Sequence, residues 1–146
     1  MTATPPPDDD PASGPPTAAP LPAEVAAVLD AVLGRDGEVR AALRRQIPHL
    51  GVRARCGCGC GTAYFDLDTG SVQPAPVAGG TRVAAEALLY TESGDCPGEV
   101  LVFTHDGFLS WLEVCSWSDD VEVTMTAAAR WLALPGDRTV PVRGAV

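Results

Sequence analysis

The sequence predicts an α+β fold in which two N-terminal helices pack on a mainly antiparallel sheet of about four to five strands. Apolar side chains first recur at helical spacing, over residues 21–33 and about 36–47, and strand-like segments follow. The two best strand segments flank His105-Asp106-Gly107, and an Asp-Gly pair is the strongest short signal for a hairpin. Because hairpin-linked strands follow the helices, we expect an antiparallel sheet with a helical layer.

Each predicted helix has one apolar stripe and a defined end. The first stripe has three- and four-residue spacing: Val25, Val28, Leu29, Val32 and Leu33. Gly34 ends this helix, whereas the second helix starts at Asp36, which suits an N-cap, and ends before Pro48. The stripe of the second helix is Val39, Leu43, Ile47 and Leu50. Three arginines lie outside that stripe: Arg40, Arg44 and Arg45.

Five segments have strand character: residues 52–58, 63–67, 82–91, 99–104 and 108–117. A last short helix is predicted over 126–134. Strict alternation along 108–117 gives one face with Phe108, Ser110, Leu112, Val114 and Ser116. The other face then carries Leu109, Trp111, Glu113, Cys115 and Trp117. This second set is too bulky for plain solvent surface, so we expect both faces of the sheet to be partly covered.

Composition divides the chain into three parts. Residues 1–20 combine seven prolines with Asp8, Asp9 and Asp10 and have no large apolar side chain after Met1, which predicts a disordered tail. Residues 21–135 form the predicted single domain. Residues 136–146 lack a helical or long alternating pattern and are expected to be loose.

The charge and hydropathy of the chain limit its partners. The net charge is −9 and all ten basic residues are arginine, so there is no electrostatic footprint for nonspecific nucleic-acid binding. No apolar run is long enough to span a membrane. No secretion signal is present, and the five cysteines are an odd number. We therefore expect a cytoplasmic protein with reduced thiols and with no nucleic-acid or membrane partner.

Three cysteines lie within five residues, at Cys56, Cys58 and Cys60. Alternate residues of an extended strand are about 6.6 Å apart, so these thiols converge on a metal only if the backbone curls, as the intervening glycines allow. A fourth zinc ligand would come from Cys115, Cys96, His49 or His105. Disulfide or redox chemistry is a further alternative. The simplest interpretation is a glycine-rich strand with inert thiols and no cofactor.

The segment Leu67-Asp68-Thr69-Gly70-Ser71 matches the active-site tetrad of aspartic proteases. With one copy in the chain, a hydrolase would need a symmetric dimer in which two Asp68 carboxylates share a proton. Asp-Thr-Gly is also an ordinary β-turn sequence, so the hydrolase is a remote alternative.

Trp111, Glu113 and Trp117 are the predicted protein-interaction residues, because they place two indoles and a carboxylate on one strand face. For Glu113 the simplest structural role is an ion pair with an arginine such as Arg82, or a cap at the sheet edge.

Several of these features occur together in a group of small, uncharacterised actinobacterial proteins, which the chain resembles from Arg55 onward. The shared features are a Cys-x-Cys stretch after two helices, the run at 107–114 (Gly-Phe-Leu-Ser-Trp-Leu-Glu-Val) and the segment Trp117-Ser118-Asp119. In size and layout that group resembles the immunity partners of bacterial toxins. The resemblance implies a non-enzymatic domain that binds a protein, and it brings no catalytic residues. A zinc-binding module remains the alternative.

Overall fold

The computed structural model describes residues 19–34, 36–57, 60–118 and 120–134. Its elements occur in this order: β1 Ala19–Pro20, α1 Ala23–Leu33, α2 Glu38–Gln46, the 3-10 turn η2 Ile47–His49, β2 Leu50–Arg55, β3 Ala63–Leu67, β4 Thr81–Leu89, β5 Gly98–His105, β6 Phe108–Ser116 and α3 Met125–Leu132. Most of the predicted tail and all of the predicted C-terminal segment, 1–18 and 136–146, lie outside the described residues.

The strands form one six-stranded antiparallel sheet in the order β1-β2-β3-β6-β5-β4. The predicted α+β class with an antiparallel sheet is thereby confirmed. The sixth strand, beyond the four to five expected, is β1, where Ala19 pairs with Val52 and Pro20 with Gly51. These two residues were assigned to the tail, because a two-residue edge strand has no alternation that a sequence pattern can show.

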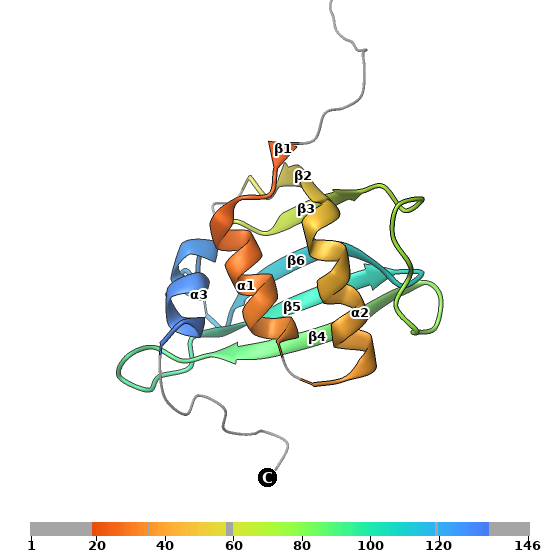
Figure 1. Ribbon diagram of the computed structural model, residues 1–146. Helices are drawn as coiled ribbons and strands as arrows, with labels where there is room; N and C mark the ends of the chain where they lie inside the picture. The colour runs from red at the N-terminus through yellow and green to blue at the C-terminus, as the bar shows by residue number, and fades with distance from the viewer. Residues whose placement is uncertain (1–18, 35, 58–59, 119, 135–146) are drawn as a thin grey trace, which may run out of the picture.

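All three helices lie on the same face of the sheet, in front of it in Figure 1. The core forms between them and the inward-facing strand residues, among them Phe65, Val102 and Leu112. The third helix, α3, begins at an N-cap where the Thr124 hydroxyl accepts a hydrogen bond from Ala127 N at 3.1 Å. Among the described residues, no helix has the length and apolar character needed to cross a membrane.

The opposite face of the sheet carries no helix of the described chain (Figure 1). We call it the open face. We expected both faces to be partly covered; on this face no described helix does so, and Trp111, Glu113 and Cys115 are half-buried among side chains of the sheet itself. The alternation along β6 also differs from the expected one, because the register shifts beside Ser110.

At this β-bulge, Thr104 pairs with Leu109 and Phe103 pairs with Trp111, so Ser110 is the extra residue. Leu109 therefore lies on the buried face with Leu112, not on the face of Trp111 as strict alternation predicts.

The hairpin between β5 and β6 turns at Asp106 and Gly107, as expected. Asp106 has φ 52° and Gly107 has φ 87°, the positive values that a type I′ turn requires at both central positions. The Asp106 carboxylate also accepts a hydrogen bond from Gly80 N at 2.7 Å. This contact ties the loop before β4 to the hairpin.

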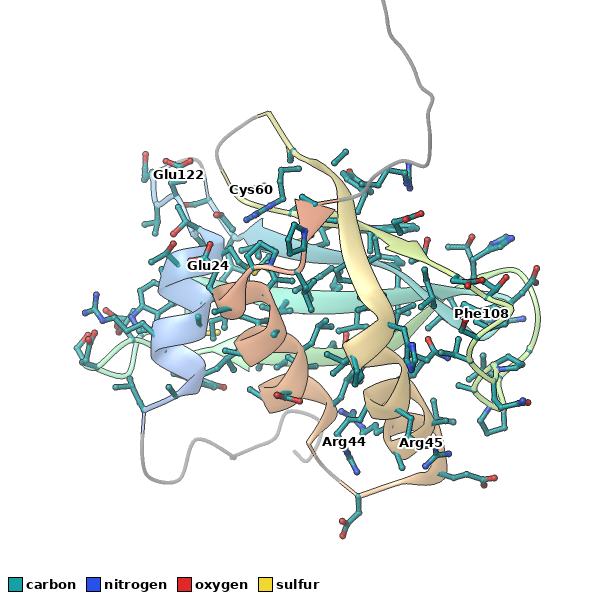
Figure 2. The ribbon with its side chains drawn as sticks, turned by 45° about the horizontal axis from the view of Figure 1, so that its top comes forward. Glu24, Arg44, Arg45, Cys60, Phe108 and Glu122 are labelled. Atoms are coloured by element: carbon teal, nitrogen blue, oxygen red, sulfur yellow. The ribbon has the colours of Figure 1, made fainter. Side chains whose placement is uncertain are left out.

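The arginines outside the stripe of α2 have a structural role. Arg40 donates to the backbone carbonyl of Val32, and Arg44 donates to that of Leu33. Figure 2 shows Arg44 beside the C-terminal end of α1. Cationic groups at a helix C-terminus satisfy its free carbonyls and complement its dipole, so these two arginines stabilise the pairing of α1 with α2.

Candidate functional site

An aromatic row crosses the open face of the sheet. Tyr64 of β3 lies opposite Trp111 of β6, which lies opposite Phe103 of β5, and Phe103 pairs with Val83 of β4. The Trp111 and Phe103 rings are stacked, with centroids 4.1 Å apart and planes at 10°. Tyr64 and Trp111 are tilted at 34° with centroids 6.2 Å apart. We call these three aromatic residues, together with Val83 at the end, the aromatic row. Val83 is 48% exposed.

Glu113 lies next to this row on the same strand. Its carboxylate accepts a hydrogen bond from Trp111 Nε1 at 3.1 Å and another from Cys115 Sγ at 3.3 Å. The expected partner Arg82 instead donates to the carbonyl of Gly79. Glu113 is therefore held in place by an indole and a thiol, both of which are uncharged donors.

Cys115 is kept in its neutral form at this position. Burial is the largest cause that raises the pKa of the Cys115 thiol; together with the hydrogen bond to Glu113 and the negative charges of Glu113 and Glu99, it brings the pKa to about 12. A thiol with so high a pKa is a poor nucleophile. It keeps its proton and donates a hydrogen bond to the carboxylate. In this arrangement Cys115 orients Glu113.

The three predicted interaction residues share the strand β6 or its end. The structure joins Trp111 and Glu113 directly through the indole hydrogen bond. Trp117 directly follows β6, is 52% exposed, and donates its backbone N–H to the Pro97 carbonyl at 2.9 Å. From Trp111 to Trp117 the chain advances about 20 Å at strand rise. Trp117 is therefore exposed beyond the end of β6, whereas Trp111 is half-buried within the strand.

Tyr64, Phe103 and Val83 were not among the predicted site residues. Each lies at an outward position of its strand. The pattern of apolar and aromatic residues in the sequence gives only a weak signal for such positions. Their alignment with Trp111 depends on the bulge beside Ser110, because an unbroken two-residue hairpin would pair Phe103 with Ser110. The aromatic row forms because of the register between β5 and β6, and the sequence pattern does not predict that register.

The cysteine run connects β2 to β3 at the end of the sheet near α3. Cys56 N donates to the Thr62 carbonyl at 2.9 Å, and Met125 N donates to the Cys60 carbonyl at 2.8 Å. The Cys60 thiol donates to the Thr62 hydroxyl at 3.2 Å. Figure 2 shows Cys60 at the same end of the molecule as Glu24, the residue that accepts from Thr126 of α3.

Three of the four predicted zinc ligands lie among the described residues: Cys56, Cys60 and Cys115. Within the described residues, no three His, Cys, Asp or Glu side chains form a group suited to a metal ion. The fourth predicted ligand, Cys58, lies outside the described residues. The zinc site through Cys56, Cys58, Cys60 and Cys115 stays a prediction.

Asp68 occupies a turn at the end of β3. Its carboxylate accepts hydrogen bonds from the Ser71 hydroxyl at 2.8 Å and from Gly70 N at 3.1 Å. These two bonds, with a smaller contribution from His49, lower the pKa of Asp68 from its ordinary value. These are the hydrogen bonds of an ordinary Asp-Thr-Gly turn, and the second carboxylate of a dyad would have to come from another copy of the chain, so the hydrolase alternative stays a prediction.

A hollow of about 530 Å³ lies between α2 and the segment after Asp68. It is lined by charged and polar groups that include Glu38, Arg45, His49 and Ser71. The Ser71 hydroxyl donates to Asp68, whose lowered pKa makes that carboxylate a weak base. The hollow holds no recognisable catalytic arrangement among the described residues.

Comparisons of this chain with protein-family models, with curated proteins and with solved structures each found no match. The resemblance to small actinobacterial proteins therefore stays a prediction. The open face of the sheet is the feature from which we infer a function.

Proposed function

We propose that this protein is a non-enzymatic interaction domain that binds a protein partner through the open face of its sheet. The observation that carries the proposal is the aromatic row, which spans four strands and leaves Val83 half exposed. Aromatic side chains are enriched at protein interfaces, where rigid rings bury large areas at a low cost in conformational entropy. Trp111 is the proposed centre of the interface, with Trp117 at its rim.

An exposed set of large apolar side chains on one face favours a binding surface over plain solvent contact. Cys115 is held protonated, and Ser71 donates to an Asp68 carboxylate that is a weak base, so neither side chain favours an enzyme instead. A cytoplasmic location is part of the proposal, and it agrees with Cys96 and Cys115, neither of which is in a disulfide. An immunity-like role is the specific form that agrees with the size and layout of the chain.

Site-specific photocrosslinking in host cells tests this function. A benzophenone amino acid replaces Val83 on the open face or, as the control, Ala31 on the exposed side of α1. We expect one adduct of defined mass from position 83, no adduct from position 31, and loss of the adduct when Trp111→Ala is added. An adduct from position 31 alone, or one from position 83 that survives Trp111→Ala, would contradict the proposal.

A further inference from the structure

The open face carries an excess of negative charge. Strand alternation places four carboxylates on it, because their neighbours in sequence are buried beneath the helices: Asp66, Glu86, Glu99 and Glu113. They come one each from β3, β4, β5 and β6. Arg53 is the extra residue at a bulge of β2, the strand on the far side of β3 from β6. The face is therefore apolar along the aromatic row and acidic beside it.

We propose that the partner of this face is a basic protein segment whose arginine or lysine side chain lies along the Trp111 ring and reaches Glu113. This inference depends on the proposed function and specifies the chemistry of the partner. A cation that lies over the face of an indole, within about 6 Å of its centroid, is attracted by the ring, and Trp111 offers the face turned away from the stacked Phe103 ring, on the side of Tyr64. Glu113 is hydrogen-bonded to that same indole at 3.1 Å, so one cationic side chain meets both groups.

The hydrogen bonds at Glu113 favour a charged partner over water alone. Both donors, the Trp111 indole and the Cys115 thiol, are neutral, so they fix the position of the carboxylate without cancelling its charge. Glu99 lies directly across the strand pair from Cys115, which brings a second carboxylate to the same end of the face. A planar guanidinium can bind such carboxylates and stack on an aromatic ring at the same time.

Charge complementarity also separates the possible occupants. A second copy of the chain would bring the same four carboxylates against themselves. Residues 1–18 would bring Asp8, Asp9 and Asp10 and no basic side chain. Like charges placed opposite each other at an interface cost free energy, whereas a basic partner removes that cost and is steered to the face by the net charge of −9.

The test uses the full-length, isotope-labelled protein and a blocked seven-residue peptide of alternating glycine and arginine. The comparison peptide has citrulline, which keeps the shape of arginine without its charge. We expect the arginine peptide to shift the Trp111 indole signal and the amide signals of Phe103 and Glu113. The citrulline peptide should bind at least tenfold more weakly.

The double variant Glu99→Gln, Glu113→Gln should also weaken the arginine peptide at least tenfold, while glutamine still accepts from the Trp111 indole. The matched control, Asp30→Asn with Glu38→Gln, removes the same number of charges from the helical side and should bind within twofold of wild type. Equal binding of the two peptides, signal changes confined to the helices, or full affinity of the Glu99→Gln, Glu113→Gln variant would overturn the inference. A dimer mass in light scattering that Trp111→Ala abolishes would also overturn it, in favour of a second copy.

The photocrosslinking result distinguishes failure of this inference from failure of the proposed function on which it depends. An adduct at position 83 that persists in the Glu99→Gln, Glu113→Gln variant overturns the basic partner and leaves the protein-binding face in place. Loss of peptide binding together with absence of any Trp111-dependent adduct overturns both.

Discussion

The side-chain carbonyl of Gln46 accepts a hydrogen bond from the backbone N–H of Leu109 at 2.9 Å, which joins α2 to the start of β6. Leu109 lies beyond the two residue pairs that connect β3 to β6, so Gln46 supplies the acceptor that a neighbouring strand would otherwise provide. The Gln46 amide donates in turn to the carbonyls of Gln73 and Gly107. With 1% of its surface exposed, this one glutamine satisfies three backbone groups beside the bulge that aligns the aromatic row.

Gln46→Ala should lower the free energy of unfolding by about 1–3 kcal/mol, because it leaves the buried N–H of Leu109 without its acceptor, while the Gly107 carbonyl keeps its hydrogen bond from Ala75 N. Chemical denaturation with tryptophan fluorescence measures this change. Gln73→Ala is the matched control, because Gln73 contributes its backbone carbonyl and its exposed side chain takes no part in the bond. A Gln46→Ala variant as stable as Gln73→Ala would show that water replaces the glutamine without cost.

Gln46 makes a long-range contact that local sequence patterns do not predict. The α+β class, both N-terminal helices and the Asp106-Gly107 hairpin followed from local patterns, which depend on residues close in sequence. Gln46 lies three residues after Leu43, beside the apolar stripe, and a glutamine there gives no sign of a partner 63 residues away. The bulge, the face of Leu109 and the aromatic row likewise depend on strand register and not on local pattern, so alternation alone placed them incorrectly or left them out.

Gly107→Ala should destabilise the protein by more than about 2 kcal/mol. A Cβ at this position would lie 2.7 Å from the Ala75 carbonyl oxygen, and the positive φ adds strain of roughly 1–2 kcal/mol. Gly94→Ala is the control for strain alone, because Gly94 has φ 94° and a Cβ there meets no atom within 4 Å. Thermal unfolding of both variants should show the larger loss at Gly107; equal losses would mean that the contact with Ala75 relaxes freely.

Cys115 should be alkylated by iodoacetamide more slowly than Cys96 at pH 8, because its pKa is raised to about 12. Mass spectrometry of the digested protein gives the rate at each thiol. Glu113→Gln should speed the reaction at Cys115, since it removes one cause of the raised pKa. The unfolded chain loses this proton near pH 9 and the folded chain retains it, so the contribution of Cys115 to stability should fall as the pH rises from 9 toward 12. Alkylation of Cys115 faster than that of Cys96 would contradict the raised pKa of Cys115.

The double change Cys56→Ser, Cys60→Ser should cost at most about 1–3 kcal/mol and leave the metal content unchanged. Serine at position 60 can retain the hydrogen bond to the Thr62 hydroxyl. Native mass spectrometry and denaturation measure the two effects, with Cys96→Ser as a control expected to be silent in both. One equivalent of zinc in the purified wild-type protein, lost in the double variant with a much larger drop in stability, would establish the zinc-binding alternative.

The sheet is joined across its middle by only two residue pairs, Ala63 with Leu112 and Tyr64 with Trp111. On one side, β4, β5 and β6 form a continuous meander of neighbouring strands; on the other, β1, β2 and β3 form a smaller ribbon. Pairing between distant parts of a chain forms late in folding, and weakly joined parts open first in the native state. The ribbon can therefore separate as its own cooperative unit while the meander stays folded. Because Val83, Phe103, Trp111 and Glu113 all belong to the meander, most of the binding face would outlast such an opening, and only Tyr64 and Asp66 of β3 would leave with the ribbon.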